Sequence, residues 1–532
     1  MIKCPNCNAE LSFNVDSQLV TCEYCRTTFD PNNLDVESKK AQELTYEGKS
    51  YLCSQCGAEL LTFDETAITF CSYCGSQAMI ESKMKQQNNP DFIIPFKISK
   101  DECIKAYLNK VSKSLFAPKY MKSDIIVNKF RGIYIPYCIY KLSFHDKSIN
   151  KGSKYKYRSG DYEYYDDYKI YADVDADYDG ISYDLISNFY DKFSHSIPYD
   201  FKTAEKFNPN YLAGFYADVA DVDKNLYESI ATYIVNEDSI NQMAKRRKFA
   251  KYGCLAPKVL FQVTEKKVGM FPLYFLAIRD KKNKYVNYAV VNGQTGKVVV
   301  DLPVDFKKYI LISILLTIPM FIFINNFLVL TPKNICIFSI ISAIISLIIS
   351  RYQLNKIHER ENHLDDIGYI YKTAEIEYKV QPKTSNKLLL FFITLGAFSL
   401  FYVFLYICIV KGLSMIQTYT VILGIIALSL IVVFFIIIKQ KNSKADISVK
   451  INNKLKLSKK EKIKYSYKSV LSILIGLAAL SLNIVDDIYY YGTAIIMFVL
   501  IIWSFYDLIK GHNLLVSTKL PQLEKRGGDE SE

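Results

Sequence analysis

Eight of the thirteen cysteines fall into two groups of four near the start of the chain. The first group forms two Cys-x-x-Cys pairs with fourteen residues between them: Cys4, Cys7, Cys22 and Cys25. Adding 49 to each number gives the second group: Cys53, Cys56, Cys71 and Cys74. A Cys-x-x-Cys turn can present two thiolates to one metal ion, and two such turns complete a tetrahedral site. The pattern predicts two tandem Cys₄ zinc ribbons, small β units that each bind one structural Zn²⁺.

The positions of the cysteines set the expected boundaries of this part of the chain. We expect zinc ribbon 1 at residues 1–30, a linker at 31–50 and zinc ribbon 2 at 51–82. Because four sulfur atoms fill the coordination sphere, no position remains for a catalytic water. A rubredoxin-like iron site has the same cysteine spacing and is an alternative. Redox-active Cys-x-x-Cys is a weaker alternative, because the βαβ context of that motif is missing.

The other five cysteines and the charge pattern bear on the compartment and on partners. These cysteines are scattered singly, which argues against a secreted disulfide framework and favours a reducing cytosol. The chain carries a net charge of +12, yet residues 1–80 hold five Lys/Arg against eleven Asp/Glu. A nucleic-acid-binding module needs a basic face, so the acidic ribbon region argues against nucleic acid as a partner.

Three stretches resemble functional motifs but lack a residue or a spacing that those motifs require. Asp175, Asp177 and Asp179 begin like a calcium loop, but Ile186 stands where the bidentate Glu belongs. The stretch GQTGK (293–297) lacks the first glycine of a phosphate loop, and we expect a β-turn there. His358 and His363 are five residues apart rather than four, which indicates a solvated loop. No nucleophile-and-base pair appears, so we expect no catalytic residues, no cofactor beyond zinc, no small-molecule substrate and no enzymatic activity.

Residues 91–307 predict an α+β cytosolic domain. Aromatic and polar residues alternate over 154–180, with Ser159-Gly160 as the turn. This pattern is typical of a β-hairpin with one solvent-exposed face. A helix is expected at 222–247, with Leu226, Ile230, Tyr233 and Ile234 on one face. Strands are expected around 258–265, 270–279 and 284–291, and a turn at 292–297.

The remainder of the chain predicts an all-α six-helix transmembrane region. Six apolar runs lie at about 309–330, 335–350, 388–410, 416–438, 469–485 and 492–509. They predict transmembrane hairpins at 308–350, 388–438 and 469–509, separated by cytoplasmic loops at 351–387 and 439–468 and followed by a cytoplasmic tail at 510–532.

Loop charges set the expected orientation. The two long loops hold seven and eleven Lys/Arg, whereas the short links hold one or none. By the positive-inside rule both termini face the cytoplasm of a multi-pass plasma-membrane protein. The Lys-rich loop 439–468 would attract anionic lipids, so membrane lipids are expected partners. We find no charge at mid-span, which weakens a transport role.

Several stretches resemble a known group of sequences: CPNCNAEL (4–11), FIIPFKISKDE (92–102), RGIYIPYCIY (131–140), NGQTGKVVVDLP (292–303) and HNLLVSTKLPQLEKRGG (512–528). The chain resembles uncharacterised bacterial integral membrane proteins with N-terminal zinc ribbons of the transcription-factor-IIB type. Relatives tend to have Trp where this chain has Cys138. The resemblance implies zinc and a membrane, and no established activity.

These patterns lead to one main expectation and three alternatives. The main expectation is a non-enzymatic zinc-binding membrane protein whose ribbons and α+β domain dock a cytosolic or membrane protein with a basic surface. The first alternative is a membrane-tethered binder of nucleic acid or transcription machinery. The others are a six-helix transport or envelope-stress component, and a metal or redox sensor.

Overall fold

The structure is a computed structural model that describes residues 3–34, 45–63, 71–77, 79–245, 260–280, 285–327, 331–361, 366–368, 380–382, 447–449, 459–482 and 486–519. The chain divides into two compact units. The second unit comprises 317–330 and 377–453, and its described part holds the end of helix α6 (Phe306–Phe327) and a pair of short strands, β15 (Val380–Pro382) and β16 (Ile447–Val449). The first unit contains both cysteine groups and all the other elements.

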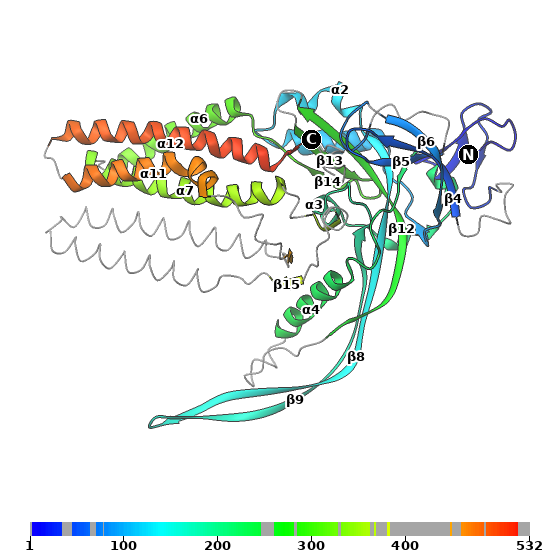
Figure 1. Ribbon diagram of the computed structural model, residues 1–532, viewed down its shortest axis with the longest axis horizontal. Coiled ribbons are helices and arrows are strands. Elements are labelled where there is room, and N and C mark those ends of the chain that lie inside the picture. The colour runs from blue at the N-terminus through cyan, green and yellow to red at the C-terminus, as the bar shows by residue number, and fades with distance from the viewer. Residues whose placement is uncertain are drawn as a thin grey trace, which may run out of the picture. The chain divides into compact units, whose positions relative to one another are not determined.

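A twelve-stranded sheet dominates the first unit, and two long antiparallel strands form its centre (Figure 1). Strand β8 (Arg131–Ser159) pairs with β12 (Gln262–Asp280) from Arg131↔Phe275 to Ser143↔Gln262. Side chains alternate between the two faces of a strand. In β8, Tyr134 lies in one buried cluster, whereas Ile133, Ile135 and Tyr137 lie in the other. Both faces of the sheet are therefore covered, which explains why this stretch is almost continuously apolar.

Shorter elements extend and cover the sheet. The strands are β4 (Thr45–Cys53), β5 (Glu59–Thr62), β6 (Met79–Asn88), β7 (Phe92–Ile93), β9 (Tyr162–Asp184), β10 (Glu205–Lys206), β11 (Tyr216–Asp218), β13 (Tyr285–Asn292), β14 (Val298–Val300) and β17 (Thr518–Lys519). The helices are α1 (Lys100–Ser112), α2 (Asp124–Val127), α3 (Asp191–Ser194) and α4 (Glu228–Lys245), with 3₁₀ turns at Lys119–Lys122, Phe201–Thr203 and Pro209–Leu212. Ser99 and Glu102 form a capping box that starts α1.

The second cysteine group belongs to this large sheet. Strand β5, which follows Cys56, pairs with β4 on one side and with β11 on the other. Strand β4 begins at Thr45, inside the stretch expected as a linker. The first cysteine group has its own three-stranded sheet, β1 (Leu11–Asn14), β2 (Leu19–Cys22) and β3 (Thr28–Phe29). The two copies of the repeat therefore share a cysteine pattern but differ in their surroundings.

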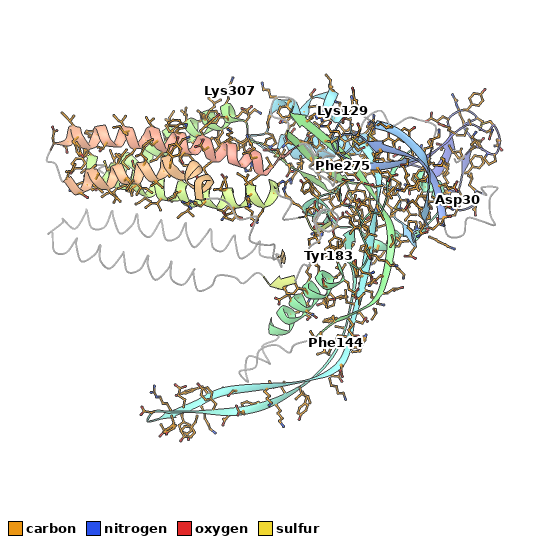
Figure 2. The ribbon with its side chains drawn as sticks, in the orientation of Figure 1. Asp30, Lys129, Phe144, Tyr183, Phe275 and Lys307 are labelled. Atoms are coloured by element: carbon orange, nitrogen blue, oxygen red, sulfur yellow. The ribbon has the colours of Figure 1, made fainter. Side chains whose placement is uncertain are left out.

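Strands β8 and β9 form a long hairpin whose outer part we call the arm, residues 144–177. The turn falls at Gly160-Asp161, next to the predicted Ser159-Gly160. The pairing of β12 with β8 ends at Ser143, so the arm continues beyond the sheet (Figure 1). Figure 2 shows Phe144 near the base of the arm and side chains projecting along its length.

Among the described residues, the first unit also contains the start of α6 and three further helices: α7 (Pro332–Glu361), α11 (Lys459–Leu482) and α12 (Asp487–Leu515). These three helices pack on one another. Two stretches, Pro332–Arg360 and Asp487–Leu515, are long and apolar enough to cross a membrane, and Tyr467–Leu482 is a shorter apolar helix. Of the six apolar runs, those at 388–410 and 416–438 lie outside the described residues.

Several local expectations need correction. The strands expected at 258–265 and 270–279 are one strand, β12, because a bulge between Val263 and Glu265 bends the chain without ending it. Helix α4 begins at Glu228, because the preceding residues form a turn. His358 lies in α7 and not in a loop, since the helix continues past the apolar run. The acidic residues Asp175, Asp177 and Asp179 lie on β9, as the strand interpretation predicted.

Candidate metal centres

The four Cys-x-x-Cys turns have one backbone geometry. After each first cysteine, the amide four residues on donates to the carbonyl of that cysteine, at 2.8 Å for Cys4, 2.9 Å for Cys22, 2.8 Å for Cys53 and 2.9 Å for Cys71. The donating residues all have positive φ: Asn8 at 60°, Arg26 at 58°, Gly57 at 72° and Gly75 at 68°. Glycine adopts this left-handed conformation at no steric cost, whereas Asn8 and Arg26 are less favourable there. The second repeat therefore has the less strained turns.

These turns bring the sulfur atoms of each group together. In the first group, the Sγ atoms of Cys4 and Cys25 are 3.5 Å apart and those of Cys7 and Cys22 are 3.4 Å apart. In the second group, the pairs Cys53–Cys74 and Cys56–Cys71 are each 3.6 Å apart. Within each group all four ligand atoms lie within 4.8 Å of one another. A tetrahedron with Zn–S bonds of about 2.3 Å has edges of roughly 3.8 Å, so each group could hold one metal ion and is compatible with zinc.

The two centres differ in burial. All four cysteines of the second group are buried, whereas Cys7 and Cys25 of the first are partly exposed. The second group lies in the same apolar cluster as Phe275, Phe271 and Tyr288 of the central sheet. We call the twelve-stranded sheet and the helices α1–α4 the large domain. A metal ion in the second group would hold together part of its core.

The first ribbon contacts the large domain through a few specific bonds. The Phe13 amide donates to the Ala213 carbonyl at 3.0 Å, and the Phe13 ring lies 5.4 Å from Tyr211. The Asn210 side-chain amide donates to the Pro31 carbonyl at 2.8 Å. The ribbon thus docks against the loop that precedes β11.

Tyr73 links the second centre to strand β11. It lies between Cys71 and Cys74, and its hydroxyl donates to the buried carboxylate of Asp218. Burial raises the pKa of Asp218 from 3.8 to about 7, partly offset by the hydrogen bond from Tyr73. Tyr24 is the equivalent residue in the first repeat and is 83% exposed. Sequence alone could not reveal this difference, because the repeats are alike at this position.

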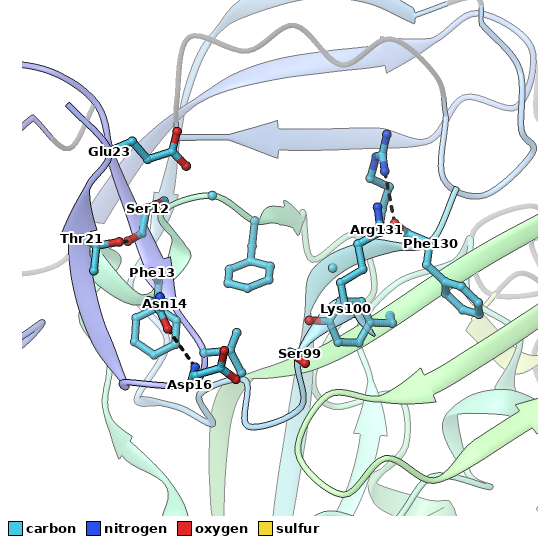
Figure 3. Close-up of a pocket in the computed structure, with 15 residues that line it drawn as sticks. Ser12, Phe13, Asn14, Asp16, Thr21, Glu23, Ser99, Lys100, Phe130 and Arg131 are labelled. Carbon is cyan, nitrogen blue, oxygen red and sulfur yellow. Dashed lines mark hydrogen bonds between the residues drawn. The ribbon is translucent and has the colours of Figure 1, made fainter. Parts of the chain in front are cut away.

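A surface cleft of about 600 Å³ separates the first ribbon from the large domain (Figure 3). Asp16 and Glu23 of the ribbon face Lys100 and Arg131 of the domain across it. Phe13, Phe215 and Tyr274 supply apolar surface. The lining contains neither histidine nor cysteine, so this cleft offers no pair of a nucleophile with an imidazole base.

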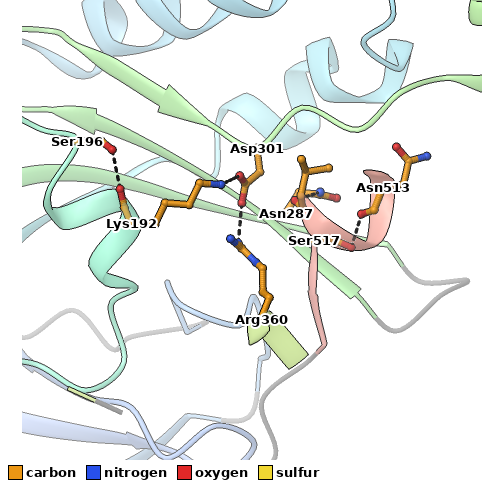
Figure 4. A network of polar contacts seen from close by, with 8 residues as sticks. Lys192, Ser196, Asn287, Asp301, Arg360, Asn513 and Ser517 are labelled. Carbon is orange, nitrogen blue, oxygen red and sulfur yellow. Dashed lines mark hydrogen bonds and ion pairs between the residues drawn. The ribbon is translucent and has the colours of Figure 1, made fainter. Parts of the chain in front are cut away.

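A buried ion pair joins the end of α7 to the large domain (Figure 4). Asp301 accepts from Lys192 at 2.8 Å and from Arg360 at 3.1 Å, and the Asp301 and Arg360 side chains are only 2% and 7% exposed. The Arg360 guanidinium also lies 5.1 Å from the ring centre of Tyr190. The charge pattern had placed Arg360 in a cytoplasmic loop, with no sign of this contact.

The end of α12 is attached to the same domain. The Asn513 side chain accepts from the Val304 amide at 2.7 Å and donates to the Val304 carbonyl at 3.0 Å. The Asn287 side-chain amide donates to the Val516 carbonyl at 2.8 Å, and β17 pairs with β13. The segment that precedes α6 and the segment at the end of α12, which are far apart in the sequence, are thus joined by hydrogen bonds.

Polar side chains lie between α7, α11 and α12, where the sequence suggested apolar spans. The hydroxyl of Ser504 lies 2.8 Å from those of Ser346 and Ser469. Lys468 pairs with Asp507 at 2.5 Å, and its ammonium lies 4.2 Å from the Trp503 ring centre. Helical spacing could have placed Ser504 and Asp507 on one face of α12, because they are three residues apart. Their partners on α7 and α11 are decided by the packing of the helices.

The chain is similar to a protein of Bacillus subtilis (strain 168) described as "Uncharacterized protein YdjG". The two are 28% identical over 319 residues, which are 58% of this chain and 91% of that protein. No protein-family model matches the chain. No solved structure matches it.

Proposed function

We propose that this chain is a non-enzymatic, multi-pass plasma-membrane protein that contains two structural zinc ions. Its ribbons and β-rich domain form a cytoplasmic platform that docks a protein partner with a basic surface. The arm is the observation that carries the docking function, and the apolar helices support the membrane assignment.

The exposure of the apolar helices supports a membrane environment. The most apolar windows of α7 and α12 have mean hydropathies of 2.1 and 2.0, yet only 22% and 28% of their residues are buried. A core helix of a soluble protein would be mostly buried. On α12, Ile488, Ile495 and Phe498 are 77%, 65% and 61% exposed. Lipid would cover these apolar side chains, whose exposure to water would be unfavourable.

The chemistry of the cysteines supports zinc as the metal. Four thiolates at tetrahedral spacing suit Zn²⁺ or a rubredoxin-like iron. The centres hold no open coordination position, so the metal's contribution is to stability, as in other small structural zinc sites.

The arm has exposed tyrosines on both faces, and one face, which we call the aromatic face, carries fewer charged residues than the other. By the register of the hairpin, Tyr157, Tyr162, Tyr164, Tyr168, Ile170 and Val174 share one face. The opposite face carries Tyr155, Tyr165 and Tyr171 among the charged and polar residues His145, Lys147, Lys151, Glu163, Asp167, Asp173 and Asp175. Tyr162, Tyr157 and Tyr164 are 75%, 49% and 46% exposed. Tyrosines on a rigid hairpin give large contact area at low cost in side-chain entropy, which suits protein recognition.

Two triple variants test docking through the arm. The first replaces Tyr157, Tyr162 and Tyr164 of the aromatic face with serine. The matched control replaces Tyr155, Tyr165 and Tyr171, which are 51%, 50% and 72% exposed on the opposite face. We would cross-link each variant in intact membranes, identify the partners by mass spectrometry, and measure binding of the purified partner to the purified chain.

We expect the aromatic-face variant to lose the partner and the control to keep it. Equal partner lists for wild type and both variants would refute docking through the arm. Salt-dependent binding of DNA by the purified chain would instead favour the nucleic-acid alternative.

A further inference from the structure

A second group of polar residues is buried where β8, β9 and α3 meet, away from the cysteines. Tyr137 of β8 and Asp184 of β9 are direct cross-strand partners, so their side chains lie side by side. They are 1% and 0% exposed. The last residue of a long hairpin thus brings a carboxylate into the core of the large domain.

Helix α3 brings a carboxylate and a hydroxyl to the same place. Asp191 and Ser194 are three residues apart and share one face of the turn. They are 4% and 3% exposed. The Asp191 carboxylate accepts from the Tyr227 hydroxyl at 3.2 Å and from the Ile367 amide at 2.8 Å, which fixes its position.

Several oxygen atoms of this group make no hydrogen bond of good geometry, although the Ser194 hydroxyl lies near both Asp184 and Tyr137. Within the part of the chain that the structure describes, these are both carboxylate oxygens of Asp184 and the hydroxyls of Tyr137 and Ser194. A buried carboxylate without well-formed hydrogen bonds is strongly unfavourable, so something must compensate its charge. The nearby cations Lys192 and Arg360 both pair with Asp301 instead.

We propose that Asp184, Asp191, Tyr137 and Ser194 bind a hard divalent cation, Ca²⁺ or Mg²⁺. All four groups offer oxygen, the ligand that these ions prefer. Two carboxylates supply the charge that balances a divalent ion. Each carboxylate oxygen has two lone pairs, so an Asp191 oxygen that accepts a hydrogen bond can also coordinate a metal ion.

A proton is the competing means of compensation. Burial and the nearby charge of Asp191 raise the pKa of Asp184 well above 3.8, and the nearby Ser194 hydroxyl offsets this only in part. Either a cation or a proton would relieve the repulsion between the two carboxylates. A neutral side chain at position 184 distinguishes the two, because it would prevent cation binding but replace a protonated carboxyl group. Asparagine at position 184 removes a metal ligand but imitates a protonated carboxyl group.

Thermal unfolding of the full chain in detergent distinguishes the two. The chain, with its zinc retained, would be passed through metal-free buffer and titrated with CaCl₂ or MgCl₂, and bound metal would be counted by elemental analysis. We expect a saturable rise of several degrees in the unfolding temperature and one Ca²⁺ or Mg²⁺ per chain. Asp184→Asn should abolish both effects. Asp175→Asn, on the exposed arm, is the control and should keep them.

Two results would overturn the cation site. One is a wild-type chain that neither responds to Ca²⁺ or Mg²⁺ nor retains them, with Asp184→Asn at least as stable, which would assign compensation to a proton. The other is binding that survives Asp184→Asn. If Asp184→Asn does not fold, Ser194→Ala replaces it, and a several-fold loss of affinity is expected from the missing hydroxyl. Unchanged affinity in Ser194→Ala would then count against the site.

Discussion

The hydroxyl of Tyr73 donates to the carboxylate of Asp218, and this bond connects a turn of the second cysteine group to the central sheet. Tyr73 is 2% exposed and Asp218 is 3% exposed. The ring of Tyr73 also lies 5.1 Å from that of Phe275. The second centre is thus joined to the sheet by both polar and aromatic contacts.

Tyr73→Phe should lower the free energy of unfolding by about 1–3 kcal/mol, because the buried carboxyl of Asp218 would lose the Tyr73 donor, although it would still accept from the Val219 amide. Chemical denaturation of the purified chain measures this loss. Tyr24→Phe is the matched control in the other repeat, and its exposed ring predicts no change. Equal effects of the two variants would contradict the role of this bond.

Stability should fall as pH rises through the window set by Asp218. Its pKa is about 7 in the folded chain against an ordinary value of 3.8, so the folded chain holds more protons between these values. The stabilising contribution is complete below about pH 4 and is lost as pH rises through about 7. Asp218→Asn should flatten this slope between about pH 5.5 and 7.5, a range that avoids acid release of metal. Parallel unfolding curves for wild type and variant would contradict the shift.

Removing the second metal centre should be more damaging than removing the first. Cys56→Ser opens a site inside the main core, whereas Cys7→Ser opens one that is partly exposed. We expect Cys56→Ser to unfold the large domain cooperatively, as seen by loss of near-UV circular dichroism. Cys7→Ser should release one metal ion and leave most of that signal.

The two ion pairs of Asp301 should contribute unequally to the stability of the folded chain. Arg360→Ala removes the more buried partner and should cost about 3–5 kcal/mol, since Asp301 stays buried. Lys192→Ala removes a partner whose side chain is 48% exposed and should cost about 1 kcal/mol or less. Limited proteolysis between the large domain and α7 would report the difference.

Close packing at Gly476 predicts an effect in the helices. A Cβ atom there would lie 2.5 Å from Ile340 Cγ1 and 2.6 Å from Met497 Cε. Gly476→Val should therefore destabilise the packing of α11 on α7 and α12 by about 1–3 kcal/mol. A Cβ at Gly492 meets no atom within 4 Å, so Gly492→Val should have a much smaller effect. The unfolding temperature of each variant in detergent measures this difference.

Features that depend on local pattern could be predicted from the sequence. Cysteine spacing identified both groups of cysteines that could hold a metal ion, and alternation identified the hairpin around residue 160. The pairing of β5 with β11 could not be predicted, because that register joins Leu61 to Ala217 through tertiary packing. Nor could Asp184 and Asp191 be recognised as neighbours, since burial of a carboxylate is decided by the fold. The functional expectation of docking stays a prediction.

If the proposed membrane assignment is right, the bonds that attach both α7 and the segment after α12 to the large domain limit how often the chain can cross a bilayer. Arg360 returns to Asp301, and β17 returns to β13. A chain that leaves one side of a membrane and comes back to it has crossed an even number of times. If the chain crosses a bilayer as proposed, the number of crossings between residues 301 and 360 would be even, and the number between 360 and 518 would be even again. Parity thus favours paired spans, and any change that left Lys519 on the opposite side would break the sheet as well as the topology.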